Sequence, residues 1–130
     1  MEKLKLTASE WPPALNQCSL SVGYHDDATI AYCDKHAITY MAFSPLCGGS
    51  NGSSCQHGSV FEIPEVNAIA ATHNKSAAQI ALKWIVQQSR PLATAVARED
   101  YARQDLDLWS FTLTSEEMDT LSAVKVPPSA

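Results

Sequence analysis

The chain has 130 residues, of which 45% are hydrophobic and 18% are charged, and its formal net charge is −5. These values are typical of one globular domain and argue against disorder over the whole chain. The acidic balance leaves no basic stripe for nucleic acid, and no apolar run approaches the ~20 residues of a membrane span. We therefore expect neither nucleic acid nor a membrane as a partner. The first residues also lack the apolar core of a signal peptide, which favours a cytoplasmic location.

The N-terminal part of the chain is predicted to alternate between helices and strands. Residues 2–10 have the pattern of the end of a helix, which stops at a Trp-Pro-Pro sequence because proline excludes helical conformation from the preceding residue. A short strand is predicted over 15–20, and Asp26 or Asp27 then caps a helix. Residues 38–43 are β-branched and aromatic without clean alternation, which is typical of a parallel strand buried on both sides.

The middle of the chain is predicted to hold a loop and two helices. Residues 47–59 are rich in glycine and serine and have no apolar period, so we expect a flexible loop within the domain. A short helix is predicted over 65–73. Ser76 opens the clearest helix, because Ser76 and Gln79 have the spacing of a capping box and an apolar stripe follows.

The C-terminal part is predicted to add a strand and two more helices. A strand candidate spans 91–95, and a short helix follows near 99–105. Thr114 and Glu117 again have the capping-box spacing and predict a last helix. Three strands that alternate with helices predict βαβ units and one parallel sheet.

The four cysteines are predicted to be free thiols, because cytosolic chains keep their cysteines reduced. Cys18 and Cys33 lie in apolar patterns and are predicted as small core residues. Cys47, Cys55 and His57 invite a zinc interpretation, but their spacing matches no zinc motif and a Gly/Ser loop is a poor cage. The sequence therefore predicts no metal site.

Histidines and tryptophans are interpreted from their neighbours in the sequence. His25, His36 and His73 lie next to predicted helix boundaries, so we expect them to be exposed to solvent. Trp84 and Trp109 fall within apolar patterns and are predicted as core residues.

Several of these segments together carry a family resemblance. The first strand ends in an Asn-Gln pair, and the second ends in an aromatic residue followed by Ser-Pro-Leu. The motifs are, in order, Asn16-Gln17, Phe43-Ser44-Pro45-Leu46, the helix over 76–84 and the run over 106–114. From about residue 2 to about residue 124, the chain resembles the second half of an aldo-keto reductase, a family of (β/α)8 barrels that reduce carbonyls with NADPH.

The resemblance implies an α/β fold, a partial (β/α)8 TIM barrel with three parallel strands and flanking helices. Residues 1–130 would form the C-terminal half of such a barrel as one unit, with the Gly/Ser loop 47–59 inside it.

The resemblance also implies where a nicotinamide nucleotide would bind. In the family, the glutamine lies against the nicotinamide carboxamide, the aromatic ring stacks on the nicotinamide, and the Ser-Pro-Leu stretch runs under the pyrophosphate. The Glu-Asn pair that contacts adenine in the family aligns with Gln104 and Asp105 of this chain. The implied cofactor contacts are Gln17, Phe43, Ser44, Leu46, Gln104 and Asp105.

The chain departs from the family pattern around the adenosine phosphate. The family's Pro-Lys-Ser stretch falls on Thr94-Ala95-Val96, and its following arginine falls on Tyr101, so the groups that hold the 2′-phosphate are replaced. A charge-assisted bond to phosphate contributes about 1.5–3 kcal/mol. Arg98 could supply one such charge from a shifted position. We expect weak nucleotide binding with little preference for NADPH over NADH.

The family's proton donor is a tyrosine assisted by lysine, aspartate and histidine, all from the first half of the barrel. The resemblance therefore assigns no catalytic residue to this chain, and Tyr24, after the first strand, is the one tyrosine to test. The expected activity is that of an oxidoreductase, NAD(P)H-dependent reduction of aldehydes or ketones. We expect this fragment to be inactive unless the missing half is supplied, and whether Met1 is the true start stays open.

The alternative class is a non-catalytic pseudoenzyme or interaction fragment. Half a barrel has open sheet edges, and unpaired edges are templates for association, including self-association.

Overall fold

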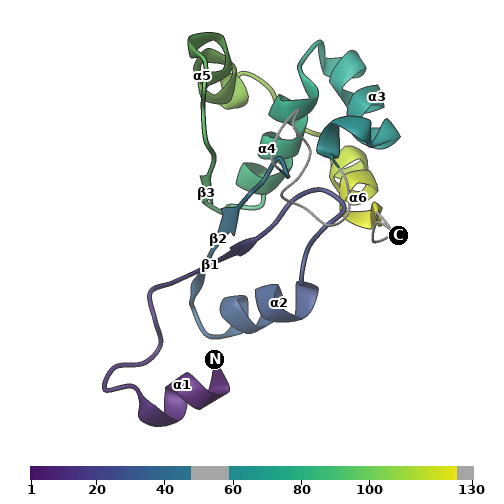
Figure 1. Ribbon diagram of the computed structural model, residues 1–130. Helices are drawn as coiled ribbons and strands as arrows, with labels where there is room; N and C mark the ends of the chain where they lie inside the picture. Colours follow the sequence, from purple (N-terminus) through teal and green to yellow (C-terminus); the bar gives the residue numbers. More distant parts are fainter. Residues whose placement is uncertain (48–58, 126–130) are drawn as a thin grey trace.

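The computed structural model describes residues 1–47 and 59–125. In these two parts of the chain, helices and strands alternate (Figure 1), and two short 3₁₀ turns, η2 and η3, lie between them. The elements are α1 (Glu2–Thr7), β1 (Leu15–Ser19), α2 (Asp27–Lys35), β2 (Thr39–Phe43), η2 (Val60–Glu62), α3 (Pro64–His73), α4 (Ala77–Gln87), β3 (Leu92–Ala93), α5 (Glu99–Leu106), η3 (Asp107–Trp109) and α6 (Ser115–Ala123). Most of the predicted loop 47–59 lies outside the described residues.

The three strands form one parallel sheet in the order β1-β2-β3. Leu15 lies opposite Thr39, and Ser19 lies opposite Phe43, which in turn lies opposite Ala93. α2 connects β1 to β2, and α3 and α4 lie between β2 and β3, so both crossovers contain helices as parallel strands require. The predicted α/β fold, with three parallel strands and flanking helices, is confirmed.

The two faces of the sheet have different environments. Tyr40 and Ala42, on one face of β2, are 1% and 0% exposed, whereas Phe43, on the other face, is 53% exposed. α2 packs against β2 and α4 against β3, and Cys33 of α2 and Ile80 of α4 belong to the same buried cluster as Tyr40 and Ala42. The prediction that this strand is buried on both sides is therefore wrong, because within the described residues the helices cover one face.

Local capping interactions start three of the helices. Asp26 caps α2 by accepting a hydrogen bond at 3.0 Å from the backbone amide three residues later. Ser76 with Gln79, and Thr114 with Glu117, form capping boxes at the starts of α4 and α6. These predictions are confirmed, because each cap depends only on residues that are three positions apart.

α4 is the central helix of the core. Its residues from Gln79 to Ile85 are all buried, and Trp84 is 2% exposed, as predicted. The Trp84 indole donates a hydrogen bond at 3.0 Å to Ser122 and so joins α4 to α6. Further core side chains come from α3, α6 and the segment before α6, namely Val66, Ile69, Leu113 and Leu121.

Several element lengths differ from the predictions. α1 ends at Thr7, before the predicted limit near residue 10, and β3 has two residues where the sequence predicted five, 91–95. The turns η2 and η3 were not predicted, because single 3₁₀ turns have no sequence period. In the two described parts of the chain, no helix has the length and apolar character that crossing a membrane requires.

Three predictions of exposure are wrong. The His25 and His73 side chains are 7% and 18% exposed, and each bonds a carboxylate, at 2.6 and 2.9 Å. Trp109 is 75% exposed, because the η3 turn places the neighbouring Leu108 in the core instead.

The cysteines divide into two groups. Cys33 is free and fully buried, as predicted, while Cys18 is free and half-buried. Cys47 is disulfide-bonded, so the expectation of free thiols throughout is wrong at this position. Cys55 and His57, which entered the zinc interpretation, lie outside the described residues.

Candidate functional site

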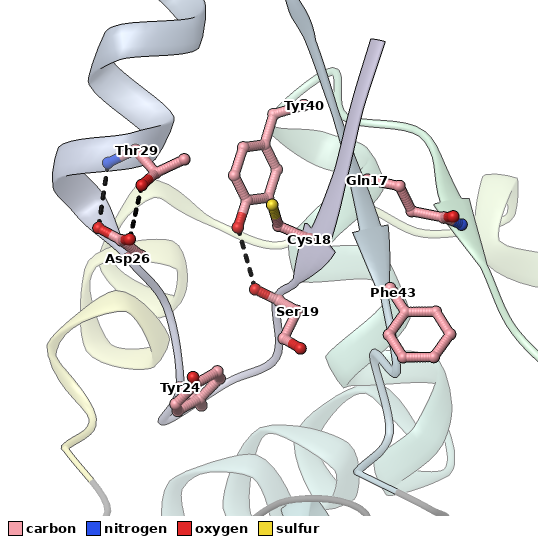
Figure 2. A pocket seen from close by; sticks show the side chains of 8 residues that line it. All are labelled: Gln17, Cys18, Ser19, Tyr24, Asp26, Thr29, Tyr40 and Phe43. Atoms are coloured by element: carbon pink, nitrogen blue, oxygen red, sulfur yellow. Dashed lines mark hydrogen bonds between the residues drawn. The ribbon is translucent and has the colours of Figure 1, made fainter. Parts of the chain in front are cut away.

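A cavity of about 350 Å³ lies at the carboxyl end of β1, next to the end of β2 (Figure 2). In parallel α/β sheets, the carboxyl ends of the strands are the usual place for a ligand. The lining residues are Gln17, Cys18, Ser19, Tyr24, Asp26, Thr29, Tyr40 and Phe43.

The strand register brings Gln17 and Phe43 to the same wall of this cavity. Gln17 lies opposite Met41, two positions before Phe43, and residues two apart on a strand point to the same face. Figure 2 shows both side chains leaving their strands on the same side. The exposed ring of Phe43 and the exposed amide of Gln17 are thus both accessible to one planar ligand.

The opposite side of β1 carries a more polar wall. The Tyr40 hydroxyl donates a hydrogen bond at 3.0 Å to the Ser19 carbonyl, and burial raises the pKa of Tyr40. The Asp26 carboxylate accepts bonds from the Thr29 hydroxyl at 2.6 Å and from its amide at 3.0 Å. These bonds lower the pKa of Asp26. Asp26 is therefore a helix cap that is ionised at neutral pH, which is the opposite of what a proton donor needs.

The chain turns sharply where it leaves β2. Ser44 has a φ of 51°, which is in the left-handed region that residues other than glycine seldom occupy. Ser44 and Leu46 are half-buried, and neither lines the cavity. The structure therefore places these two predicted cofactor residues directly after Phe43, beside the cavity and not in its wall.

Gln104 and Asp105, the predicted adenine contacts, lie on α5 and do not line the cavity. The Gln104 carbonyl accepts a hydrogen bond at 3.2 Å from the side chain of Gln79. Burial raises the pKa of Asp105. A ligand that contacted both groups of predicted residues would have to extend from the cavity towards α5.

The sequence did not single out the polar wall as a site. Cys18, Thr29 and Tyr40 come from separate elements, and they meet only because β1 and β2 pair and α2 packs behind them. Tyr24, considered only as a catalytic candidate, also lines the cavity. Within residues 1–47 and 59–125, no group of three or more His, Cys, Asp or Glu residues could hold a metal ion.

Comparison with known proteins identifies the family. A model described as "Aldo/keto reductase family" matches residues 1–126. The chain belongs to the aldo/keto reductase family. The resemblance that the motifs predicted is confirmed.

Relatives of this aldo/keto reductase chain are much longer than it is. It is 31% identical to Protein REDOX 2 of Catharanthus roseus over 126 residues, which make up 95% of this chain and 38% of that protein. It is 30% identical to the (1S)-1,7-diacetoxy-luvungin A aldo-keto reductase of Citrus sinensis over 124 residues, which again make up 95% of this chain and 38% of that protein. The chain thus spans about 38% of the length of these relatives.

Solved structures agree with the family fold. A mutant of Gox0644 in complex with NADPH superposes with a TM-score of 0.81 at 20% identity, over 99% of this chain and 45% of that chain. An aldo/keto reductase from Brucella melitensis gives a TM-score of 0.80 at 27% identity, over 95% of this chain and 44% of that one. The described fold is therefore that of part of an aldo/keto reductase.

Proposed function

We propose that this chain supplies the nicotinamide-binding wall of an NAD(P)H-dependent reductase of aldehydes or ketones. The observation that carries the proposal is that Gln17 and Phe43 line one cavity from the same face of the sheet. A primary amide beside an exposed flat ring fits a planar ring that bears a carboxamide. Relatives from Citrus sinensis and Papaver somniferum are named as reductases, which supports the reaction class.

The two residues have separate tasks in the proposed site. The Phe43 ring stacks on one face of the nicotinamide and leaves the other face open to the substrate. The Gln17 amide can both donate to and accept from the carboxamide, which fixes the orientation of the ring. When bound, the nucleotide supplies the hydride that reduces the carbonyl carbon.

We propose that the proton comes from a residue outside this chain. The described lining of the cavity contains no lysine and no histidine. Tyr24 is in the lining, but the family's proton donor is a tyrosine that acts with a lysine, an aspartate and a histidine from the first half of the barrel, and Tyr24 follows β1. Tyr40 already donates to Ser19 and has a raised pKa, so its role is to hold β1 in place. The chain alone is therefore inactive.

Weak nucleotide binding is part of the same proposal. Thr94-Ala95-Val96 offer no charged group to an adenosine phosphate. The Arg98 guanidinium lies 5.1 Å from the centre of the Tyr101 ring and bonds Asp100 at 2.9 Å. A phosphate would have to compete with Asp100 for Arg98, so we expect similar affinities for NADPH and NADH.

The test is titration of the 130-residue chain with NADPH and NADH, followed by nucleotide fluorescence. We expect Phe43→Ala to weaken binding by roughly 5- to 150-fold, because stacking of a base on an aromatic ring contributes ~1–3 kcal/mol. Phe43→Tyr should retain the affinity, since it keeps the flat ring. Leu15→Ala, on the same face at the other end of β1, is the matched control and should bind normally. Unchanged binding in Phe43→Ala would contradict the proposed site.

The second candidate function is association without catalysis. It is favoured by one observation: in the described parts of the chain no helix covers the face of the sheet that carries the exposed Leu15 and Phe43 side chains.

A further inference from the structure

One side of the cavity carries an aromatic ring and a negative charge. Tyr24 and Asp26 both line the cavity. In Figure 2 they lie on one side of Ser19, and the proposed nicotinamide wall lies on the other side. Among the described lining residues, Asp26 alone has a formal charge, and none is a lysine, an arginine or a histidine. This part of the cavity is therefore electrostatically negative.

The turn after β1 sets the position of Tyr24. Ser21 and Tyr24 exchange backbone hydrogen bonds at 2.9 and 3.0 Å, and Gly23 between them has a φ of 84°, which a residue with a side chain seldom adopts. The next side chain, that of His25, is 7% exposed and is turned towards Trp84, with 5.9 Å between the ring centres. The Tyr24 side chain stays at the cavity, and 41% of this residue is exposed.

The Asp26 carboxylate is exposed and ionised at neutral pH. Hydrogen bonds from the Thr29 hydroxyl and amide lower the pKa of this carboxyl group. Its two oxygens can accept about four hydrogen bonds in all, so the contacts with Thr29 leave room for a ligand. The N-terminus of α2 carries a partial positive charge of about half a unit, but Asp26 and Asp27 outweigh it with one full negative charge each.

An exposed ring combined with an ionised carboxylate suits an alkylammonium group. The face of the Tyr24 ring attracts a cation through its quadrupole, and the Asp26 carboxylate adds a direct Coulomb attraction. The same ring provides apolar contact for the carbon atoms of such a ligand. The cavity, with a volume of about 350 Å³, has the size of a small-molecule pocket. A carboxylate in the same place would be repelled by Asp26.

We propose that Tyr24 and Asp26 bind a positively charged alkylammonium group, so that the preferred substrates are aldehydes or ketones that carry such a group. The substrate spans the cavity, with its cation at Tyr24 and Asp26 and its carbonyl group towards Phe43. Asp26 is then a specificity-determining residue that disfavours substrates with a carboxylate. The carbonyl part of this assignment rests on the proposed function, whereas binding of the cation requires no nucleotide.

The experiment is titration of the 130-residue chain, without nucleotide, with choline and with its uncharged isostere neohexyl alcohol, followed by NMR chemical shifts. The two alcohols have the same shape, and only choline is charged. We expect choline to bind roughly 5- to 30-fold more tightly at low salt, because a cation–π contact and an exposed ion pair each contribute modestly. Added salt should lower this ratio, since the ion pair is exposed. Equal affinities, or no binding of choline, would overturn the proposal.

Asp26→Asn and Asp27→Asn are a matched pair of variants. Asparagine caps a helix as well as aspartate does, so Asp26→Asn keeps the start of α2 and removes the charge from the cavity. It should remove most of the preference for choline. Asp27→Asn removes the same charge one residue later, at a side chain that is 73% exposed and outside the lining, and should keep the preference. An equal loss in both variants would show an effect of net charge and contradict the assigned site.

Tyr24→Leu tests the aromatic ring, with Tyr24→Phe as its control. Leucine removes the π face, so the preference for choline should fall several-fold. Phenylalanine keeps the face and should keep the preference. An unchanged preference in Tyr24→Leu would contradict the role of the ring. Circular dichroism of each purified variant checks that it is folded.

Failure of this proposal is distinguishable from failure of the proposed function. A chain that binds NADPH but does not prefer choline would overturn the cation site alone. A chain that prefers choline but does not bind NADPH would contradict the nicotinamide wall and support the cation site.

Discussion

Individual side chains in this protein differ widely in how far their environment depends on distant residues. Ile85 is fully buried in α4, where α3 and the turn η2 pack against the same helix. Leu106 has a side chain of the same size as that of Ile85, but it lies on α5 and 77% of its surface is exposed. Lys83 shows a third case, because it is 6% exposed and its ammonium lies 5.3 Å from the centre of the Trp109 ring. A cation over an aromatic face retains part of the stabilisation that water would provide.

These environments predict a large difference between two alanine substitutions. Ile85→Ala should lower the free energy of unfolding by about 2–5 kcal/mol, because it removes buried methyl groups and leaves a cavity. Leu106→Ala should change it by about 0.5 kcal/mol or less, since its side chain is already in water. Urea unfolding followed by circular dichroism measures both values. Similar losses in the two variants would show that α4 is not the core helix.

At the scale of elements, α2 is tied to the segment before β3 by an ion pair. Arg90 donates to both carboxylate oxygens of Asp34, at 3.0 and 2.8 Å, across 56 positions of sequence. The hydrogen bonds from Arg90 lower the pKa of Asp34 in the folded protein. The Arg90 guanidinium also lies 5.8 Å from the centre of the Tyr40 ring, so the same side chain contacts the buried face of β2.

This pair predicts a pH dependence of stability with a definite sign. Because folding lowers the pKa of Asp34, its contribution is fully present above the unfolded value of about 3.9 and is lost as the pH falls through the lower folded value. Asp34→Asn should therefore make stability less dependent on pH below about pH 4. Urea unfolding midpoints across that range provide the measurement, and Asp119→Asn, at an exposed position of α6, is the control. An identical acid dependence in the wild type and in Asp34→Asn would contradict the role of this pair.

At the scale of the whole molecule, the helices of residues 1–47 and 59–125 bury one face of the sheet and leave the face with Gln17 and Phe43 open. The two edge strands, β1 and β3, each pair with β2 and with no other strand in the described parts of the chain. The same geometry leaves the Gln17 amide and the Phe43 ring of the proposed nicotinamide wall accessible to a ligand.

The expected consequence is that the isolated chain shows no steady-state turnover. With NADPH and a simple aldehyde, nucleotide absorbance should fall no faster than in a protein-free sample, because the proposed proton donor does not belong to the described lining of the cavity. An intact relative of the family serves as the positive control. A rate that is present in the wild type and absent in Phe43→Ala would sink this expectation.

The sequence alone determined the features that depend on near neighbours. The capping boxes of Ser76 and Thr114 use residues three positions away, and the parallel strands follow from the alternation of helix and strand segments. The motifs around Gln17 and Phe43 were also sufficient to predict the family, because their residue types and their order along the chain match those of the family. Local spacing acts before any tertiary contact forms, so it can be read without coordinates.

Only the tertiary structure decided which surfaces are covered. Residues 38–43 are hydrophobic enough for burial on both sides, yet Phe43 is exposed because the helices described in the structure pack on the other face of β2. His73 is half-buried against Glu117, and Trp109 points outward, for the same reason: their neighbours come from elements far away in the sequence. Burial is a property of what packs against a residue, and the identity of that partner is fixed by the fold and not by the local sequence.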